Sequence, residues 1–190
     1  MLALVDRLPP PVASRLKRWF IRWLVPFNRS LGVRVSGLDA DAERFSLAMP
    51  SRRRNTNVAG TVHGAAIMAL AEAVHGVAVL WHFSPAGHRM YTKEIRMRYL
   101  KPARGALRVT FRLDPAVRND IHAALERDGA CDLVLSSVVA DRGGTPVARC
   151  NATYTVLRVR DGHPAKSATR ATIRETATDP GEPGDSRDEG

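Results

Sequence analysis

A short polar stretch in the first half of the chain carries residue types that could take part in catalysis. It spans residues 57–64, reads Asn-Val-Ala-Gly-Thr-Val-His-Gly, and leads directly into an apolar segment at residues 65–80. A glycine-bearing polar turn followed by Ala, Ile, Met, Leu and Val is typical of a loop that leads into a buried helix. The only strongly polar side chains in that helix would be Glu72 and His75. Because an ionised carboxylate inside an apolar helix is costly unless it is paired or used, Glu72 is a candidate functional residue.

The segments around this stretch predict the elements that would position it. Alternating apolar and polar residues, or short apolar runs between turn residues, predict six strands. These are residues 31–38, 43–49, 94–99, 107–113, 131–140 and 147–157. A short helix that begins at Asn119 or Asp120 and ends at Gly129 is expected between the fourth and fifth strands. Since a long apolar helix needs cover on most sides, we expect an α+β fold in which one antiparallel sheet curls around the central helix.

Composition divides the chain into three parts. In residues 1–30, apolar residues spaced i, i+3, i+4, i+7, i+8, with basic residues mostly off that stripe, predict an amphipathic helix and its lead-in. Residues 31–158 contain the strand and helix patterns of one folded domain. In residues 159–190, Pro, Gly, Thr, Asp and Glu replace the apolar pattern, which predicts a disordered tail.

The formal charge of +10 requires that anionic partners be weighed. Six basic residues and one acidic residue lie in the first thirty positions. We expect no nucleic-acid partner, because no zinc-binding Cys/His spacing, heptad repeat or RNA-binding aromatic cluster accompanies the charge. The basic helix from Arg15 to Leu24 would suit an anionic membrane surface, but its pattern equally suits packing on a domain, which we favour.

The cysteine content and the apolar runs indicate a cytoplasmic protein. Cys131 and Cys150 are too few for a disulfide framework, and each lies in a strand-like apolar run where cysteine behaves as a small hydrophobe. The first residues lack the apolar core of a signal peptide, and no later stretch holds eighteen uncharged apolar residues. We therefore expect neither a signal peptide nor a membrane-spanning helix.

The motif, in this order of elements, resembles a known family. Asn57-x-x-Gly60-x-x-His63-Gly64, with an acid nine residues after the histidine at Glu72, is similar to the motif of hotdog-fold acyl-CoA thioesterases of the phenylacetate-degradation type. The resemblance covers residues 31–158 and implies a hotdog fold that hydrolyses acyl-CoA.

Two further segments and one departure refine this resemblance. Residues 26–32 and 52–55 are more similar to a less characterised branch of thioesterase-like hotdog proteins. The thioesterases usually carry His-Gly-Gly, whereas Ala65 replaces the second glycine here. If that position needs a bare glycine, the pocket would bind acyl-CoA less well or accept only certain acyl groups.

The resemblance also implies roles for individual residues. It places the oxyanion contact on the backbone N–H of Gly64, where the unpaired N–H groups of a helix N-terminus suit developing negative charge. Glu72 would act as general base for a water molecule, or as a nucleophile through a mixed anhydride. Asn57 would orient the carbonyl group or the water, and His63 is expected to hold the loop by hydrogen bonds. In addition to these roles, His63 and Ala65 are candidate substrate-binding residues.

Structural alternatives stay open for these residues. Glu72 could be satisfied by a neighbouring hydroxyl group or by His75, and Asn57 could tie a turn. Glu72 and His75 lack a recognisable third ligand, so we expect no metal ion and no cofactor. The alternative function is a non-catalytic hotdog module that binds acyl-CoA or lipid.

The arginine run ahead of the motif has two interpretations. Arg52, Arg53 and Arg54 are candidate ligands for the phosphates of CoA, although such a run is more often a solvated loop.

The spacing of the two main candidates predicts a site shared between subunits. Gly64 and Glu72 are eight residues apart, which is about 12 Å along a continuous helix. If both serve one carbonyl group, Glu72 must come from a second chain whose helix runs antiparallel across a two-fold axis. We therefore expect a homodimer or a homotetramer.

Overall fold

The computed structural model describes residues 25–39, 43–83, 87–160, 163–164 and 171–175. The amphipathic helix predicted from Arg15 to Leu24 lies outside these residues. The elements are α3 (Pro26–Leu31), β1 (Arg34–Leu38), β2 (Arg44–Met49), a 3-10 helix (Arg53–Asn55), α4 (Gly64–His82), β3 (His88–Tyr99), β4 (Leu107–Arg112), α5 (Pro115–Asp128), β5 (Ala130–Asp141), β6 (Pro146–Arg160), β7 (His163–Pro164) and β8 (Ala171–Arg174).

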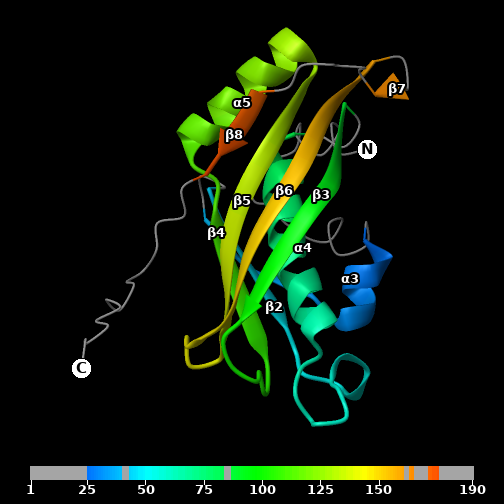
Figure 1. Ribbon diagram of the computed structural model, residues 1–190, viewed down its shortest axis with the longest axis vertical. Coiled ribbons are helices and arrows are strands. Elements are labelled where there is room, and N and C mark those ends of the chain that lie inside the picture. Colours follow the sequence, from blue (N-terminus) through cyan, green and yellow to red (C-terminus); the bar gives the residue numbers. More distant parts are fainter. Residues whose placement is uncertain (1–24, 40–42, 84–86, 161–162, 165–170, 176–190) are drawn as a thin grey trace, which may run out of the picture.

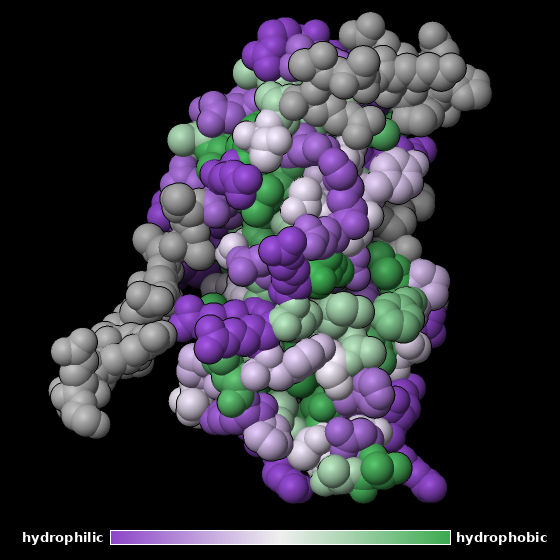
Figure 2. Space-filling model, in the orientation of Figure 1, coloured by the Kyte–Doolittle hydropathy of each residue, from purple (hydrophilic) through white to green (hydrophobic). Residues whose placement is uncertain are grey.

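Six strands form a curved antiparallel sheet in the order β1-β2-β4-β5-β6-β3 (Figure 1). In β4 buried and exposed side chains alternate strictly, because successive residues of a strand point to opposite faces. The buried face of the sheet packs on α4. On the outer face, seen in Figure 2, hydrophilic and apolar side chains are interspersed. An antiparallel sheet with one packed and one solvated face accounts for this alternation.

The long helix α4 forms the centre of the core. Eleven of its 19 residues are buried, and it contacts β2, β4, β5, β6 and β3. Its length and apolar composition would by themselves suffice to cross a membrane, but here it is the core helix against which the sheet packs. A long helix wrapped by a six-stranded antiparallel sheet is the α+β hotdog fold, and this prediction is confirmed.

The short helix differs from its prediction at its N-terminus. It begins at Pro115 and not at Asn119 or Asp120, because the side chain of Asp114 accepts a hydrogen bond from the N–H of Ala116 and proline occupies the first turn. It ends where predicted, at Gly129, whose φ of 71° lies in the left-handed region that glycine adopts readily.

Part of the segment predicted as a disordered tail is ordered. Strand β6 continues to Arg160, β7 pairs with it, and β8 pairs in parallel with residues 131–134 of β5. Strand β8 can pair here because β4 pairs only with residues 138–141 of β5, which leaves the N-terminal part of the same edge of β5 without a partner from β4. Strand β8 occupies this open edge, and Ala171 and Ile173 pack against the core.

Candidate functional site

The first turn of α4 is capped by the histidine of the motif. His63 is the N-cap residue, and its Nδ1 accepts a hydrogen bond from the N–H of Ala65 at 3.1 Å. The backbone carbonyl of His63 accepts from the N–H groups of Ala66 and Ile67. The hydrogen bonds of His63 therefore agree with the expectation that it holds the loop and the helix terminus.

The backbone N–H of Gly64 has no hydrogen-bond acceptor in this turn. Within the described chain, no hydrogen bond involves its N–H group, whereas the next three N–H groups are all bonded to His63. Its carbonyl oxygen accepts a hydrogen bond of 3.0 Å from the hydroxyl of Tyr99. The helix N-terminus therefore presents one free N–H, at the position predicted for the oxyanion contact.

Asn57 forms its hydrogen bonds within the loop. Its Oδ1 accepts from the N–H groups of Ala59 and Thr61, and its Nδ2 donates to the hydroxyl of Thr61 at 2.8 Å. A second asparagine, Asn55, is buried and bonds to the backbone of Pro50 and Arg52, while its own carbonyl accepts from the N–H of His63. The geometry of Asn57 is thus that of a turn residue that shapes the loop before Gly64.

The side chains beside this helix terminus are exposed. Ala65 is solvent-accessible, so its methyl group fills no packed position. Arg52, Arg53 and Arg54 are also exposed, in and next to the 3-10 helix. Both features leave room for a ligand at the outer end of α4.

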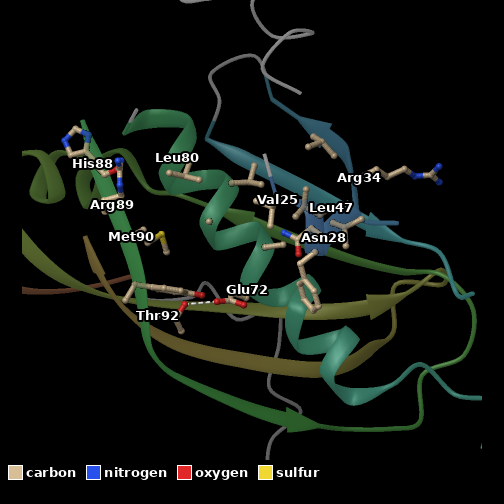
Figure 3. A pocket seen from close by; sticks show the side chains of 17 residues that line it. Val25, Asn28, Arg34, Leu47, Glu72, Leu80, His88, Arg89, Met90 and Thr92 are labelled. Carbon is tan, nitrogen blue, oxygen red and sulfur yellow. Dashed lines mark hydrogen bonds between the residues drawn. The ribbon is translucent and has the colours of Figure 1, made fainter. Parts of the chain in front are cut away.

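Glu72 lies further along α4, at the boundary of a cavity. It is half-buried, not enclosed in the helix interior, and its Oε1 accepts a hydrogen bond of 2.7 Å from the hydroxyl of Thr92 on β3 (Figure 3). The neighbouring hydroxyl that the sequence left as an alternative partner is therefore Thr92. Oε2 makes no hydrogen bond to the part of the chain that the structure describes. One carboxylate oxygen is therefore fixed by Thr92, and the other can still accept a hydrogen bond from a ligand or a water molecule.

The cavity next to Glu72 has a volume of about 440 Å³. Figure 3 shows lining side chains on β3 at one side of α4 and on α3, β1 and β2 at the other, with Glu72 and Thr92 together and Leu80 and His88 further along α4 and β3. Its wall is mainly apolar. The apolar residues lining it are Val25, Phe27, Val33, Val35, Leu47, Ala73, Gly76, Val77, Leu80 and Met90. The polar residues lining it are Asn28, Arg34, Glu72, His88, Arg89 and Thr92, and His88 and Arg89 lie at the opposite end from Glu72 and Thr92 (Figure 3). A mainly apolar cavity of this size with a few polar groups is typical of small-ligand sites.

The buried polar residue of α4 is His75. Its ring is fully buried, and Nδ1 lies 2.9 Å from the hydroxyl of Tyr154, which itself lines the cavity. Burial lowers the pKa of His75 to about 3, and the backbone of Ser136 opposes this shift less strongly. His75 therefore pairs with Tyr154 and not with Glu72.

No cluster of metal-ligating side chains occurs among the described residues. Both cysteines are free and buried, as predicted, and burial raises the pKa of Cys131 to about 12 and that of Cys150 to about 11. Thiols with such pKa values remain protonated near neutral pH, which does not suit them to act as nucleophiles.

Gly64 and Glu72 do not meet within one chain. Gly64 lines a separate cavity formed with Ile67 and Tyr99, and Glu72 is absent from its wall. Thr92, which bonds to Glu72, and Tyr99, which bonds to Gly64, are seven residues apart on β3, or about 23 Å along an extended strand.

Sequence reasoning missed Thr92, Tyr154 and Gly76 as residues of the cavity. Thr92 and Tyr154 are cross-strand partners in the β3–β6 ladder, which no local pattern could indicate. Gly76 carried a signal, because an isolated glycine inside a helical pattern lowers helix stability and so has a packing or functional reason.

Comparisons with known proteins agree with this architecture. A protein of unknown function from Pseudomonas aeruginosa, described as a probable thioesterase, is 27% identical, with a TM-score of 0.70 over 80% of this chain and 97% of that chain. A protein of unknown function from Chlorobaculum tepidum is 17% identical, with a TM-score of 0.67 over 81% of this chain and 99% of that one. A thioesterase from Haemophilus influenzae is 18% identical, with a TM-score of 0.56 over 72% and 87%. The last two likenesses show the fold alone.

Comparison with curated proteins finds no significant match. Residues 13–156 match a family model described as "Domain of unknown function (DUF4442)". Since these residues make up most of the 190-residue chain, the protein belongs to the DUF4442 family.

Proposed function

We propose that this protein hydrolyses an acyl thioester, with acyl-CoA as the substrate class, at a site shared by two subunits. One observation carries the proposal: α4 presents a free backbone donor at Gly64 and a half-open carboxylate at Glu72, next to an apolar cavity. Structural likeness, at 27% identity, to a protein described as a probable thioesterase supports the same reaction class.

The reaction needs two complementary groups. The Gly64 N–H donates to the thioester oxygen as negative charge develops there, helped by the dipole of α4. Glu72 removes a proton from water, and the water oxygen bonds to the carbonyl carbon. The C–S bond then breaks, and the protonated Glu72 gives its proton to the leaving sulfur, which yields a carboxylic acid, a thiol and the original carboxylate. In the nucleophilic alternative, Glu72 itself bonds to that carbon, the thiolate leaves, and water hydrolyses the mixed anhydride. Thr92 holds one carboxylate oxygen and so directs the other towards the substrate.

Three features support a shared site. The two groups lie at separate cavities in one chain, too far apart to act on one carbonyl carbon. The less buried positions Ala65, Met68 and Glu72 form a stripe along α4, and its two apolar side chains would be covered by a second helix that packs there. Within the described chain, β3 pairs on one side only, and such an edge of twelve residues is usually covered. We therefore propose a homodimer with antiparallel central helices, alone or as half of a tetramer.

The exposed arginines at residues 52–54 suit the phosphates of CoA. They lie just before the loop that leads to Gly64, and they are exposed. Guanidinium groups bind phosphate oxygens through paired hydrogen bonds, so this loop would hold the nucleotide end of the substrate outside the apolar cavity.

The test is thiol release from a panel of acyl-CoA substrates by the wild-type protein and by Glu72→Gln. The variant should lose at least a hundredfold in kcat while its unfolding temperature stays the same or rises, because the amide keeps the shape but cannot act as a base. Glu94→Gln, which removes the same charge from the outer face of β3, is the matched control and should stay active. Normal turnover by a folded Glu72→Gln variant would refute the assignment, and binding of the acyl-CoAs without turnover by the wild type would select the non-catalytic acyl-binding module instead.

A further inference from the structure

The cavity is lined by residues on or next to α3, β1, β2, α4, β3 and β6, and two of these elements, α4 and β3, run along it. Its wall follows α4 from Glu72 to Leu80, eight residues or about 12 Å of helix rise. It follows β3 from Thr92 to His88, four residues or about 13 Å of strand. The two independent measures agree, and Figure 3 shows both elements running along the cavity in this way.

An extended acyl chain of defined length matches this distance. With C–C bonds of about 1.5 Å at tetrahedral angles, each carbon advances the chain by about 1.25 Å. About 12 Å therefore corresponds to eight to ten carbons, counted from a carbonyl group beside Glu72. Between the two ends the wall is mainly apolar, with Ala73, Val77 and Met90 among its residues, so it suits methylene groups. Arg89 is the charged residue of the wall between Thr92 and His88 on β3.

Gly76 is the residue that leaves the middle of this cavity open. A Cβ atom added at Gly76 would meet no atom within 4 Å, so the surrounding protein does not require a glycine there. Glycine inside a helix is unfavourable relative to alanine, and α4 is otherwise rich in strong helix formers. The residue also lines the cavity, so a side chain here would project into the space available to a ligand.

We propose that the cavity is an acyl-chain site for linear acyl groups of about eight to ten carbons, and that Gly76 determines this length by leaving the site open. The substrate assignment rests on the proposed thioester hydrolysis. The position of Gly76 along α4 indicates which carbon of the acyl chain it would face. It lies four residues beyond Glu72, or about 6 Å of helix rise, which corresponds to the fifth carbon of the acyl chain.

The test uses thioesters of N-acetylcysteamine with butanoyl, octanoyl, decanoyl and dodecanoyl groups, since this thiol is the end shared by CoA and acyl-carrier-protein substrates. In the wild type, kcat/KM should peak at octanoyl or decanoyl. In Gly76→Leu, kcat/KM for decanoyl should fall at least a hundredfold relative to that for butanoyl. In Gly76→Ala, the same ratio should fall about tenfold, and the unfolding temperature should rise by about 2–4 °C from the gain in helix propensity. Leu80→Ala should move the optimum to dodecanoyl.

Two controls separate this inference from other effects. Asn119→Ala on an exposed turn of α5 also raises helix propensity but should leave the chain-length profile unchanged. Sedimentation of the Gly76 variants reports whether the glycine serves a subunit interface instead. A changed oligomeric state with an unchanged chain-length profile would overturn the inference, and so would a profile that does not respond to Gly76→Leu.

The inference can fail or hold apart from the proposed reaction. S-decyl-N-acetylcysteamine, a thioether that cannot be hydrolysed, should raise the unfolding temperature of the wild type but not that of Gly76→Leu, whereas the S-butyl thioether should act alike on both. If no thioester is hydrolysed but this pattern of thioether binding is found, the acyl-chain site stands and the hydrolase proposal falls. If thioesters are hydrolysed but the thioethers bind both proteins alike, the hydrolase proposal stands and the acyl-chain site falls.

Discussion

Removal of a single backbone donor would test the shared site most directly. Gly64→Pro removes the N–H proposed to contact the thioester oxygen. Proline is well tolerated at the first position of a helix, and the φ of −62° and ψ of 135° at His63 suit a residue that precedes proline. Gly64→Ala is the matched control, because it keeps the N–H but adds the same Cβ atom, which would lie 3.1 Å from the hydroxyl of Tyr99. Half of Tyr99 is exposed, so its ring can move aside.

The size of the effect follows from the geometry. Loss of one oxyanion donor lowers kcat by about 10² to 10³, or about 2.7–4 kcal/mol of transition-state stabilisation. Gly64→Ala should lose much less, because its N–H remains. Gly64→Pro and Glu72→Gln subunits should each be nearly inactive alone. A dimer that contains one of each has one site with both groups intact and one site with both removed.

Subunits with two different affinity tags allow the mixed dimer to be isolated after co-refolding. The purified mixed dimer should have about half the wild-type activity per dimer, and a random equal mixture about a quarter, because about half of its dimers are mixed. An inactive mixed dimer would refute the reasoning, since it would mean that Gly64 and Glu72 act within one chain. A Gly64→Pro or Glu72→Gln protein that is active alone would mean that the substituted group has no role in the reaction.

Four further outcomes follow from the buried and cavity-lining groups. The pKa of His75 falls from 6.5 to about 3 on folding, so the folded protein holds this ring in its neutral form. The free energy of unfolding should therefore be full above about pH 6.5 and decrease towards pH 3. In urea titrations, His75→Gln should lack this pH dependence of stability. Glu175 behaves oppositely, because burial raises its pKa from 4.5 to about 7. Its contribution to the free energy of unfolding is full below about pH 4.5 and is lost as pH rises through 7, by about 1–2 kcal/mol after allowance for its partial exposure. The variant Glu175→Gln should not show this loss of stability. Tyr154→Phe leaves Nδ1 of His75 without its partner in the core and should lower the free energy of unfolding by about 1–3 kcal/mol, which the same titrations would measure. For a positioning effect at the site, Thr92→Val should lower kcat about tenfold with little change in KM, and an unchanged kcat would show that Glu72 does not need this hydrogen bond.

Local patterns in the sequence were sufficient for the order of α4, α5 and the six main strands and for the residues of the helix terminus, but not for α3, β7 and β8. The polar loop, the capping position of His63 and the long apolar helix depend on neighbours within a few residues, so composition and spacing along the chain predict them. The same holds for the strands, whose alternation reflects one buried and one solvated face. The hotdog arrangement then follows, since the buried helix needs cover.

Only the tertiary structure decided which side chains meet. Thr92 reaches Glu72, and Tyr154 reaches His75, because β3 and β6 pair in one register and α4 crosses them at one height. A slip of β3 by one residue along β6 would turn the side chain of Thr92 to the outer face, away from Glu72. The packing of β8 on the open edge of β5 is likewise set by the short pairing of β4, which no local pattern records. Contacts between residues 20 to 79 positions apart depend on how whole elements pack, and this is why the cavity and the partners of Glu72 and His75 could not be predicted from the sequence.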